Sequence, residues 1–363
     1  MGATCEHAAE QVTRALGFDC HDVNPVVSVR NPFDLASWTM PVLEVLIVAG
    51  AVFALVHAVR RFRAGDPTNL ALWCASLVYL FVTEPPLYFP EWFGLDKQFG
   101  FIFAHNEFTV QFMWDRLPLY IVACYPAFSQ LAYEIVRTLG VFRDRGALVG
   151  SIAVAFVCQV FYEIFDQLGP QLKWWGWNDA NTDVNHPALA SVPMTSMLLF
   201  ASVSFGAMTY LVVRLVGSRA ADGRPRHGWS LGWRIVVAGA LAPPAMGLFG
   251  IPSGIAGDVT VQAWVIGIEL GLVWLAGAWI LVGQGRRHSR RVEPVSPFAR
   301  VYPAAYLLVM AVLWLTALPA YVDATDGVTS DGTPIGSGWY TVACFVAAVA
   351  VLGVLHQRLE VRA

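Results

Sequence analysis

The chain is poor in charged residues. Lys, Arg, Asp and Glu make up only 13% of its 363 residues, whereas a soluble domain carries about 25%. A globule of this size with so few charges lacks the polar groups to cover its surface, which excludes a soluble enzyme and a disordered chain. A net charge of −3 also gives no indication of a basic surface that could bind nucleic acid. We therefore expect no nucleic-acid partner.

Several chemical motifs are missing as well. The sequence has no GxxxxGK[S/T] and no GxGxxG after a strand, so phosphate and nucleotide sites have no support. Its six cysteines form no CxxC pair, and no HExxH-type or EExxH-type helix motif occurs. Hydrophobic residues, by contrast, reach 56%, and the mean hydropathy is +0.55. This composition predicts a polytopic membrane protein.

Nine apolar segments approach the roughly 20 residues that cross a bilayer. They predict an all-α, polytopic integral membrane helical bundle of about nine transmembrane helices, at 39–60, 68–88, 117–139, 147–168, 190–216, 231–251, 259–283, 301–321 and 338–357. The adjacent prolines Pro243 and Pro244 should break or kink the sixth segment. We expect a short N-terminal tail (1–38), one transmembrane domain (39–358) and a C-terminal tail (359–363).

Basic residues follow every second segment. All of the 23 lysines and arginines lie at one predicted side of the membrane except five, namely Arg14, Arg30, Lys97, Arg116 and Lys173. The positive-inside rule places the arginine-rich side in the cytoplasm, with the N-terminus outside and the C-terminus inside. The sequence thus predicts a multi-pass plasma-membrane protein. On the outer side Cys5 and Cys20 would meet oxidising conditions and could pair; two free thiols are the alternative.

Two predicted outer loops, 89–116 and 169–189, are unusually aromatic. Aromatic side chains are common at the boundary between water and lipid, and we expect these loops to lie on the membrane as an interfacial helix or a re-entrant element. They would then contact membrane lipid and cover a pocket. The candidate substrate-binding residues from these loops are Trp114, Trp174, Trp177 and Asn178.

Ionisable residues inside predicted spans are the leading candidates for chemistry, because a charge in the membrane is costly. Gln159, Glu163 and Asp166 are spaced i, i+4, i+7, which places them on one helical face. A pair of carboxylates one turn apart suits general acid and base catalysis. The alternative is a helix end that simply reaches solvent.

Glu84 precedes Pro85 and Pro86, which should break the helix and leave this glutamate on an irregular, buried segment. We therefore predict Glu163, Asp166 and Glu84 as catalytic residues, with Glu84 as the expected partner of Glu163. Glu134 and Arg137, at i and i+3 near the other membrane face, favour a structural ion pair.

Further candidates are weaker. Glu269 lies near the middle of the seventh segment with no charge close to it in sequence, and we assign it, with Gln159, to substrate binding. His105, Glu107 and His186 are predicted at one depth and are ligand types of zinc and iron sites. A metal cofactor at these residues is a hypothesis, and the cofactor is otherwise unknown.

In general plan the chain resembles small integral-membrane enzymes of isoprenoid metabolism, such as membrane terpene cyclases and carotenoid-modifying proteins, which also place isolated carboxylates on membrane helices. No stretch of sequence carries this likeness, so no residue role is transferred. The leading hypothesis is an enzyme for a lipid or isoprenoid-like substrate. The alternatives are a proton- or cation-coupled transporter of small molecules, and a non-catalytic subunit or assembly factor of a membrane complex with a membrane protein as partner.

Overall fold

The protein is an integral membrane protein built around long apolar helices. The computed structural model describes residues 5–217, 225–286 and 294–360, and within these ranges nine spans are long and apolar enough to cross a membrane. They are α2 (Thr39–Arg63), α3 (Thr68–Tyr88), α4 (Leu119–Thr138), α5 (Val141–Asp166), η2 (Ser196–Val203) with α7 (Ser204–Leu215), α8 (Gly228–Ala240) with α9 (Ala242–Gly254), α10 (Val259–Gly285), α11 (Pro297–Val322) and α12 (Gly338–Glu360).

All nine predicted spans are therefore confirmed, with boundaries that differ by a few residues. Parts of two predicted arginine clusters, around Arg219 and around Arg290, and the end of the tail 359–363 lie outside the described residues.

Local chemistry explains where several helices begin. α10 starts after Asp258, whose side chain accepts the backbone N–H groups of Thr260 (2.8 Å) and Val261 (3.1 Å). α11 starts after Ser296, whose Oγ accepts from the N–H of Ala299 at 3.2 Å. These caps satisfy N–H groups that have no partner within the helix.

Two spans are irregular. The sixth is divided into α8 and α9 at Leu241, just before Pro243 and Pro244, as predicted from their missing N–H groups. The fifth begins as a π-helix, η2, and continues as α7. α3, in contrast, runs through Pro85 and Pro86 as far as Tyr88, so the predicted helix break at Glu84 is wrong. Both prolines lie in the last turn, where the helix loses few further hydrogen bonds.

The aromatic loops, together with β1 from the N-terminal segment, form a small cap of short strands and short helices and not the expected interfacial helix. Its elements are β1 (Val27–Val29), η1 (Pro90–Phe93), β2 (Phe103–His105), β3 (Val110–Phe112), β4 (Leu117–Pro118), β5 (Trp175–Trp177), α6 (Thr182–Asn185), β6 (Ala188–Leu189) and β7 (Val192–Pro193). The strands pair in the orders β1-β3-β4, β2-β5 and β6-β7. Pairing between distant segments satisfies the backbone groups of these loops, a solution that periodicity within one loop does not reveal.

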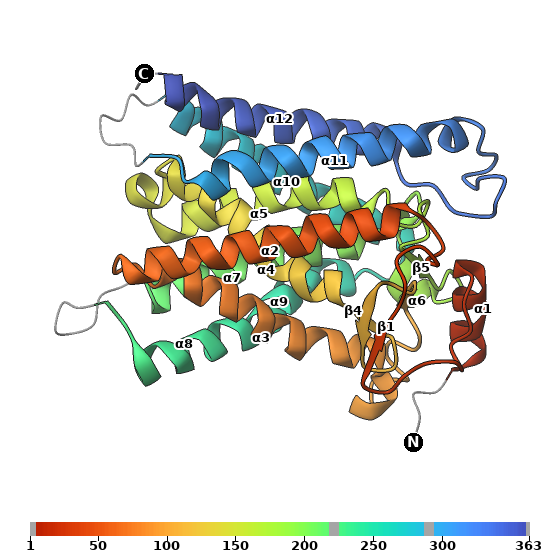
Figure 1. Cartoon of the computed structure of the whole chain (residues 1–363). Helices are drawn as coiled ribbons and strands as arrows, with labels where there is room; N and C mark the ends of the chain where they lie inside the picture. The colour runs from red at the N-terminus through yellow and green to blue at the C-terminus, as the bar shows by residue number, and fades with distance from the viewer. Residues whose placement is uncertain (1–4, 218–224, 287–293, 361–363) are drawn as a thin grey trace.

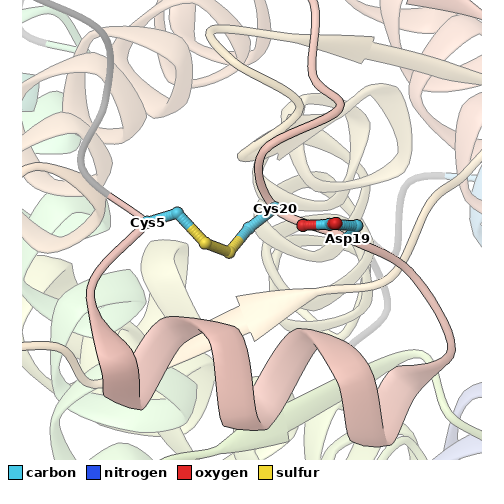
Figure 2. A group of neighbouring side chains, drawn as sticks. All are labelled: Cys5, Asp19 and Cys20. Atoms are coloured by element: carbon cyan, nitrogen blue, oxygen red, sulfur yellow. A yellow bond between two sulfur atoms is a disulfide. The ribbon is translucent and has the colours of Figure 1, made fainter.

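The N-terminal segment completes this cap. α1 (His7–Leu16) packs on β2 and β5, and Asn106 Nδ2 donates to the carbonyl of Leu16 at 3.0 Å. Cys5 and Cys20, on either side of α1, form the predicted disulfide (Figure 2). The cap lies at one end of the bundle, and α12 ends at the other (Figure 1).

α4 and α5 occupy the centre of the bundle. In α4, 89% of the most apolar window is buried within the protein, and in α5 78%, compared with 22% in the span of α8 and α9. Side chains at the cap end of α4 and α5 are thus shielded from lipid, whereas α8 and α9 present apolar side chains outward.

Candidate functional site

A cavity of about 480 Å³ lies between the membrane helices and the cap. Aromatic and aliphatic side chains supply most of its lining, from α3, α4, α5, η2, α7 and α9 below and from β2, β5 and the 98–102 segment above. The polar side chains that line it are Tyr79, Thr83, Glu84, Gln98, His105, Tyr125, Tyr162, Asp166, Asp183, Asn185, Thr195 and Ser196. The exposed residues Gln98 and Asp183 mark where the cavity reaches the surface of the cap, and the exposed Gly247 marks its side along α9.

Glu84 is one of two buried carboxylates in this lining, at 7% exposure. Its Oε1 accepts a hydrogen bond from the hydroxyl of Tyr125 on α4. Its Oε2 is buried and has no hydrogen bond of standard geometry among the described residues, although the hydroxyl of Tyr88 also interacts with this carboxylate. A buried polar atom without a partner costs free energy, so this oxygen is available to a ligand.

Asp166 is the second, and it ends α5. Its Oδ2 accepts from Ser196 Oγ at 3.4 Å, at the start of η2, and the side chain is 3% exposed. The π-helical start of the fifth span thus provides the one side-chain hydrogen bond to Asp166 that the described residues show. π-helical turns occur often at functional sites.

Glu163 lies one turn from Asp166 but does not line the cavity. Its Oε2 accepts from Gln167 Nε2 at 3.2 Å, and Gln167 in turn accepts from the backbone N–H of Ser337 at 2.7 Å. Gln159 donates to the hydroxyl of Tyr340 at 3.0 Å. This polar stripe faces the start of α12, and the expected Glu163–Glu84 pair is not among the hydrogen bonds of the described residues.

His105 lines the cavity from β2, opposite Trp175 on β5. Its Nδ1 lies 2.7 Å from the hydroxyl of Tyr120. Burial lowers the pKa of His105 from its usual range to about 3, because an apolar environment disfavours the charged imidazolium. The imidazole is therefore neutral at physiological pH.

The three predicted metal ligands do not come together. His105 is engaged with Tyr120, Glu107 forms an ion pair with Arg30 at 2.7 Å, and His186 lines a different cavity. Burial raises the pKa of Glu107, although Arg30 acts in the opposite direction. In the described part of the chain the only group of three potential ligands is Cys5, Asp19 and Cys20, and both of its sulfur atoms are consumed by the disulfide (Figure 2).

The predicted substrate-binding residues are divided. Trp177 lines the cavity, but Trp174 lies behind it, fully buried, with its Nε1 donating to Thr39 Oγ1 at 3.1 Å. Trp114 packs against Trp92 in the cap, with ring centroids 5.0 Å apart. Glu269 lies on α10 outside the cavity lining, and its Oε2 has no hydrogen-bond partner among the described residues.

A second, larger cavity of about 1080 Å³ lies on the outer face of the cap. Asn178 and His186 line it, together with the loop between α11 and α12. Asn178 Nδ2 also donates to the carbonyl of Phe101 at 2.8 Å. Trp175, Trp177, Asn185 and Pro193 border both cavities, so only the thickness of these residues separates the two.

Sequence reasoning missed the hydroxyl groups of the first cavity. Tyr79, Tyr125 and Tyr162 come from apolar stretches of three different spans, where an isolated tyrosine gives no signal of its own. Tyr79 donates to the sulfur of Met246 on α9 at 3.0 Å, and Ser196 is recognisable only through its contact with Asp166.

No family model, no curated protein and no solved structure matches the chain. The interpretation of the site therefore depends on its own geometry.

Proposed function

We propose that this integral membrane protein is an enzyme that binds a lipid or isoprenoid-like molecule in the 480 Å³ cavity and acts on it through Glu84 and Asp166. One observation carries the proposal: two buried carboxylates with few hydrogen-bond partners line one cavity that is otherwise mainly aromatic and aliphatic. Ligand sites are typically apolar cavities with a few converging polar groups.

The lining suggests how the two carboxylates share the chemistry. Glu84 is held by Tyr125 and Asp166 by Ser196, which fixes each side chain from a neighbouring helix. One carboxylic acid can donate a proton to a bound hydrocarbon or hydroxyl group while the other carboxylate accepts one, the usual division in acid–base catalysis. Glu163 and Gln159, behind the cavity, serve as positioning residues for the cap end of α5.

The location of the cavity supports a substrate that comes from the bilayer. α9 provides Pro243, Met246 and Gly247 to one wall, and most of the span to which it belongs is exposed in the protein. A hydrophobic molecule can approach this wall directly from lipid. The second wall, the cap, covers the cavity except where the exposed residues Gln98 and Asp183 mark its opening, and so limits the access of water to reactive intermediates.

We also propose that the capped end faces outward across the plasma membrane. The Cys5–Cys20 disulfide belongs to this end, and disulfides persist in oxidising compartments. The basic cluster Arg60, Arg61 and Arg63 ends α2 at the opposite end of its helix, as the positive-inside rule requires. Impermeant thiol labelling should modify Ser330→Cys from outside intact cells and Ala64→Cys only after permeabilisation. The reverse result would overturn this orientation.

The catalytic proposal is tested by lipid extracts. Cells that express the wild-type chain should contain an apolar product that is absent, by liquid chromatography and mass spectrometry, when Asp166→Asn or Glu84→Gln is expressed to the same level. Glu269→Gln removes a membrane-embedded carboxylate outside the cavity and should keep the product. An unchanged extract on wild-type expression, or a product that survives both cavity substitutions, would contradict the proposal.

A further inference from the structure

The described lining of the cavity contains acidic and aromatic side chains but no lysine or arginine. Glu84 and Asp166 lie inside it and Asp183 at its surface opening, whereas neither lysine nor arginine occurs among its described lining residues. His105, the one basic side chain present, is neutral because burial lowers its pKa to about 3. Sites for phosphate or carboxylate groups normally present Arg, Lys or a helix N-terminus to the anion.

The nearest candidates for an anion partner lie outside the described cavity lining. Arg116 precedes α4 and lies over the ring of Phe101, 5.6 Å from its centroid; its buried Nη1 has no hydrogen-bond partner among the described residues, but the side chain does not line the cavity. Lys173 pairs with Asp331 at 3.3 Å beside the outer cavity. An anionic headgroup in the inner cavity would thus face Glu84 and Asp166, at least one of them ionised, with no cation in the described lining to compensate, which is unfavourable in a medium of low dielectric constant.

A positive centre would find the opposite environment. The rings of Tyr125, Phe205 and Tyr79 lie close together, with centroid separations of 5.2 Å between Tyr79 and Tyr125 and 6.3 Å between Tyr125 and Phe205. All of them line the cavity, and Tyr125 donates to Glu84. Aromatic faces beside a carboxylate attract cations, most strongly where water is excluded.

We infer that the cavity selects its ligand by charge, accepting an uncharged or cationic hydrocarbon chain and rejecting one that carries a phosphate or a carboxylate. This inference rests on the proposed function and narrows its substrate class. A prenyl diphosphate, for example, is excluded as substrate, whereas a chain bearing only carbon–carbon double bonds or a hydroxyl group fits.

Three probes with the same farnesyl chain test the inference: farnesol, farnesyl phosphate and farnesyl trimethylammonium. Each is titrated into wild-type protein in nanodiscs of phosphatidylcholine, a lipid without net charge, and empty nanodiscs measure partitioning into lipid. We expect saturable binding of the ammonium and alcohol probes, with the ammonium at least about tenfold tighter than the phosphate.

Two variants assign the effect to the cavity. The double substitution Glu84→Gln with Asp166→Asn should reduce the preference for ammonium over phosphate to within about threefold and leave farnesol binding nearly unchanged. Glu269→Gln, a matched carboxylate substitution outside the cavity, should keep the wild-type preference.

The outcomes separate the two proposals. Saturable farnesyl phosphate binding at least as tight as that of the ammonium would overturn selection by charge but leave the proposed lipid-binding cavity standing. A preference for ammonium that survives the double substitution would do the same. Absence of saturable binding of all three probes would overturn both the charge rule and the proposed lipid-binding cavity.

Discussion

Buried carboxylates at the two ends of this bundle have very different surroundings. At the end opposite the cap, Glu134 on α4 contacts Arg137 (2.7 Å), His57 (3.0 Å) and Asn69 (2.8 Å), and it also accepts from Ser296 Oγ at 3.1 Å. At the cap end, Glu84 and Asp166 have few hydrogen-bond partners, chiefly the hydroxyl groups of Tyr125 and Ser196, and line a cavity. Both environments are nearly inaccessible to water, so burial alone does not separate them.

The number of partners is what distinguishes these carboxylates. Glu134 joins α2, α3, α4 and the start of α11 through its contacts, so its charge is compensated and its role is structural. Glu84 and Asp166 keep oxygens with few partners in a space that a ligand can fill. A membrane carboxylate is therefore a candidate for chemistry when its hydrogen bonds are incomplete and it also lines a cavity, which Glu163 and Glu269 do not.

The largest expected effect comes from breaking the complete network. Glu134→Leu should leave the Arg137 guanidinium and His57 buried without their carboxylate, and removal of one partner of a buried pair costs about 3–5 kcal/mol. We expect a strongly lowered melting temperature in detergent, or loss of monodisperse protein. A melting temperature equal to that of the wild type would show that the network is not structural.

The disulfide tests whether the cavity depends on its cap. Replacing both Cys5 and Cys20 by serine removes a link between residues 15 apart in sequence, worth about 3 kcal/mol in the chain-entropy model. We expect faster amide hydrogen exchange in α1, β2 and β5, with little change in α10 and α11. If the double substitution changed hydrogen exchange equally in the cap and in the bundle, the disulfide would not stabilise the cap in particular.

Acid should loosen the cap through His105. Its pKa of about 3 in the folded protein is below the ordinary value near 6.5 in an unfolded chain. The unfolded state therefore binds more protons between these values, so the stabilisation is complete above pH 6.5 and falls by about 1.4 kcal/mol per unit as the pH drops toward 3.

His105→Asn removes this titration and should flatten the dependence of cap stability on pH between 6.5 and 3, measured by hydrogen exchange of β2 and β5. An equally steep dependence in the variant would assign the acid sensitivity to another group.

The smallest effects on stability are expected inside the cavity. Glu84→Gln and Asp166→Asn exchange a carboxylate for an amide of the same shape, and each should change the free energy of unfolding by less than about 1 kcal/mol, since few partners are lost. The same variants should abolish product formation. A loss of stability as large as that of Glu134→Leu would show that these two residues have a structural role, as Glu134 has.

The positions of the spans could be predicted from the sequence because the length of each apolar segment and the charges at its ends determine them locally. Segment 68–88 coincides with α3, and Pro243 with Pro244 correctly predicted the division of the sixth span. The disulfide was also predicted, from placement alone. The cap was not, since β2 pairs with β5 from a loop about 70 residues later, and no local pattern encodes that pairing.

The site was predicted in part for the same reason. Helical spacing placed Glu163 and Asp166 on one polar stripe, but only packing determines that Asp166 faces the cavity and Glu163 faces α12. Glu84 was found through its charge, whereas its partner Tyr125 carries no charge and lies in an apolar run. Contacts between spans are set by side-chain packing, which a single sequence does not show.

An experimental density map of the protein purified from its native membrane tests the central claim most directly. The account predicts elongated, non-protein density in the cavity, within contact distance of Glu84 and Asp166, in the wild-type protein. A cavity that is collapsed, or that contains only ordered water in contact with both carboxylates, would contradict a site for a hydrophobic ligand.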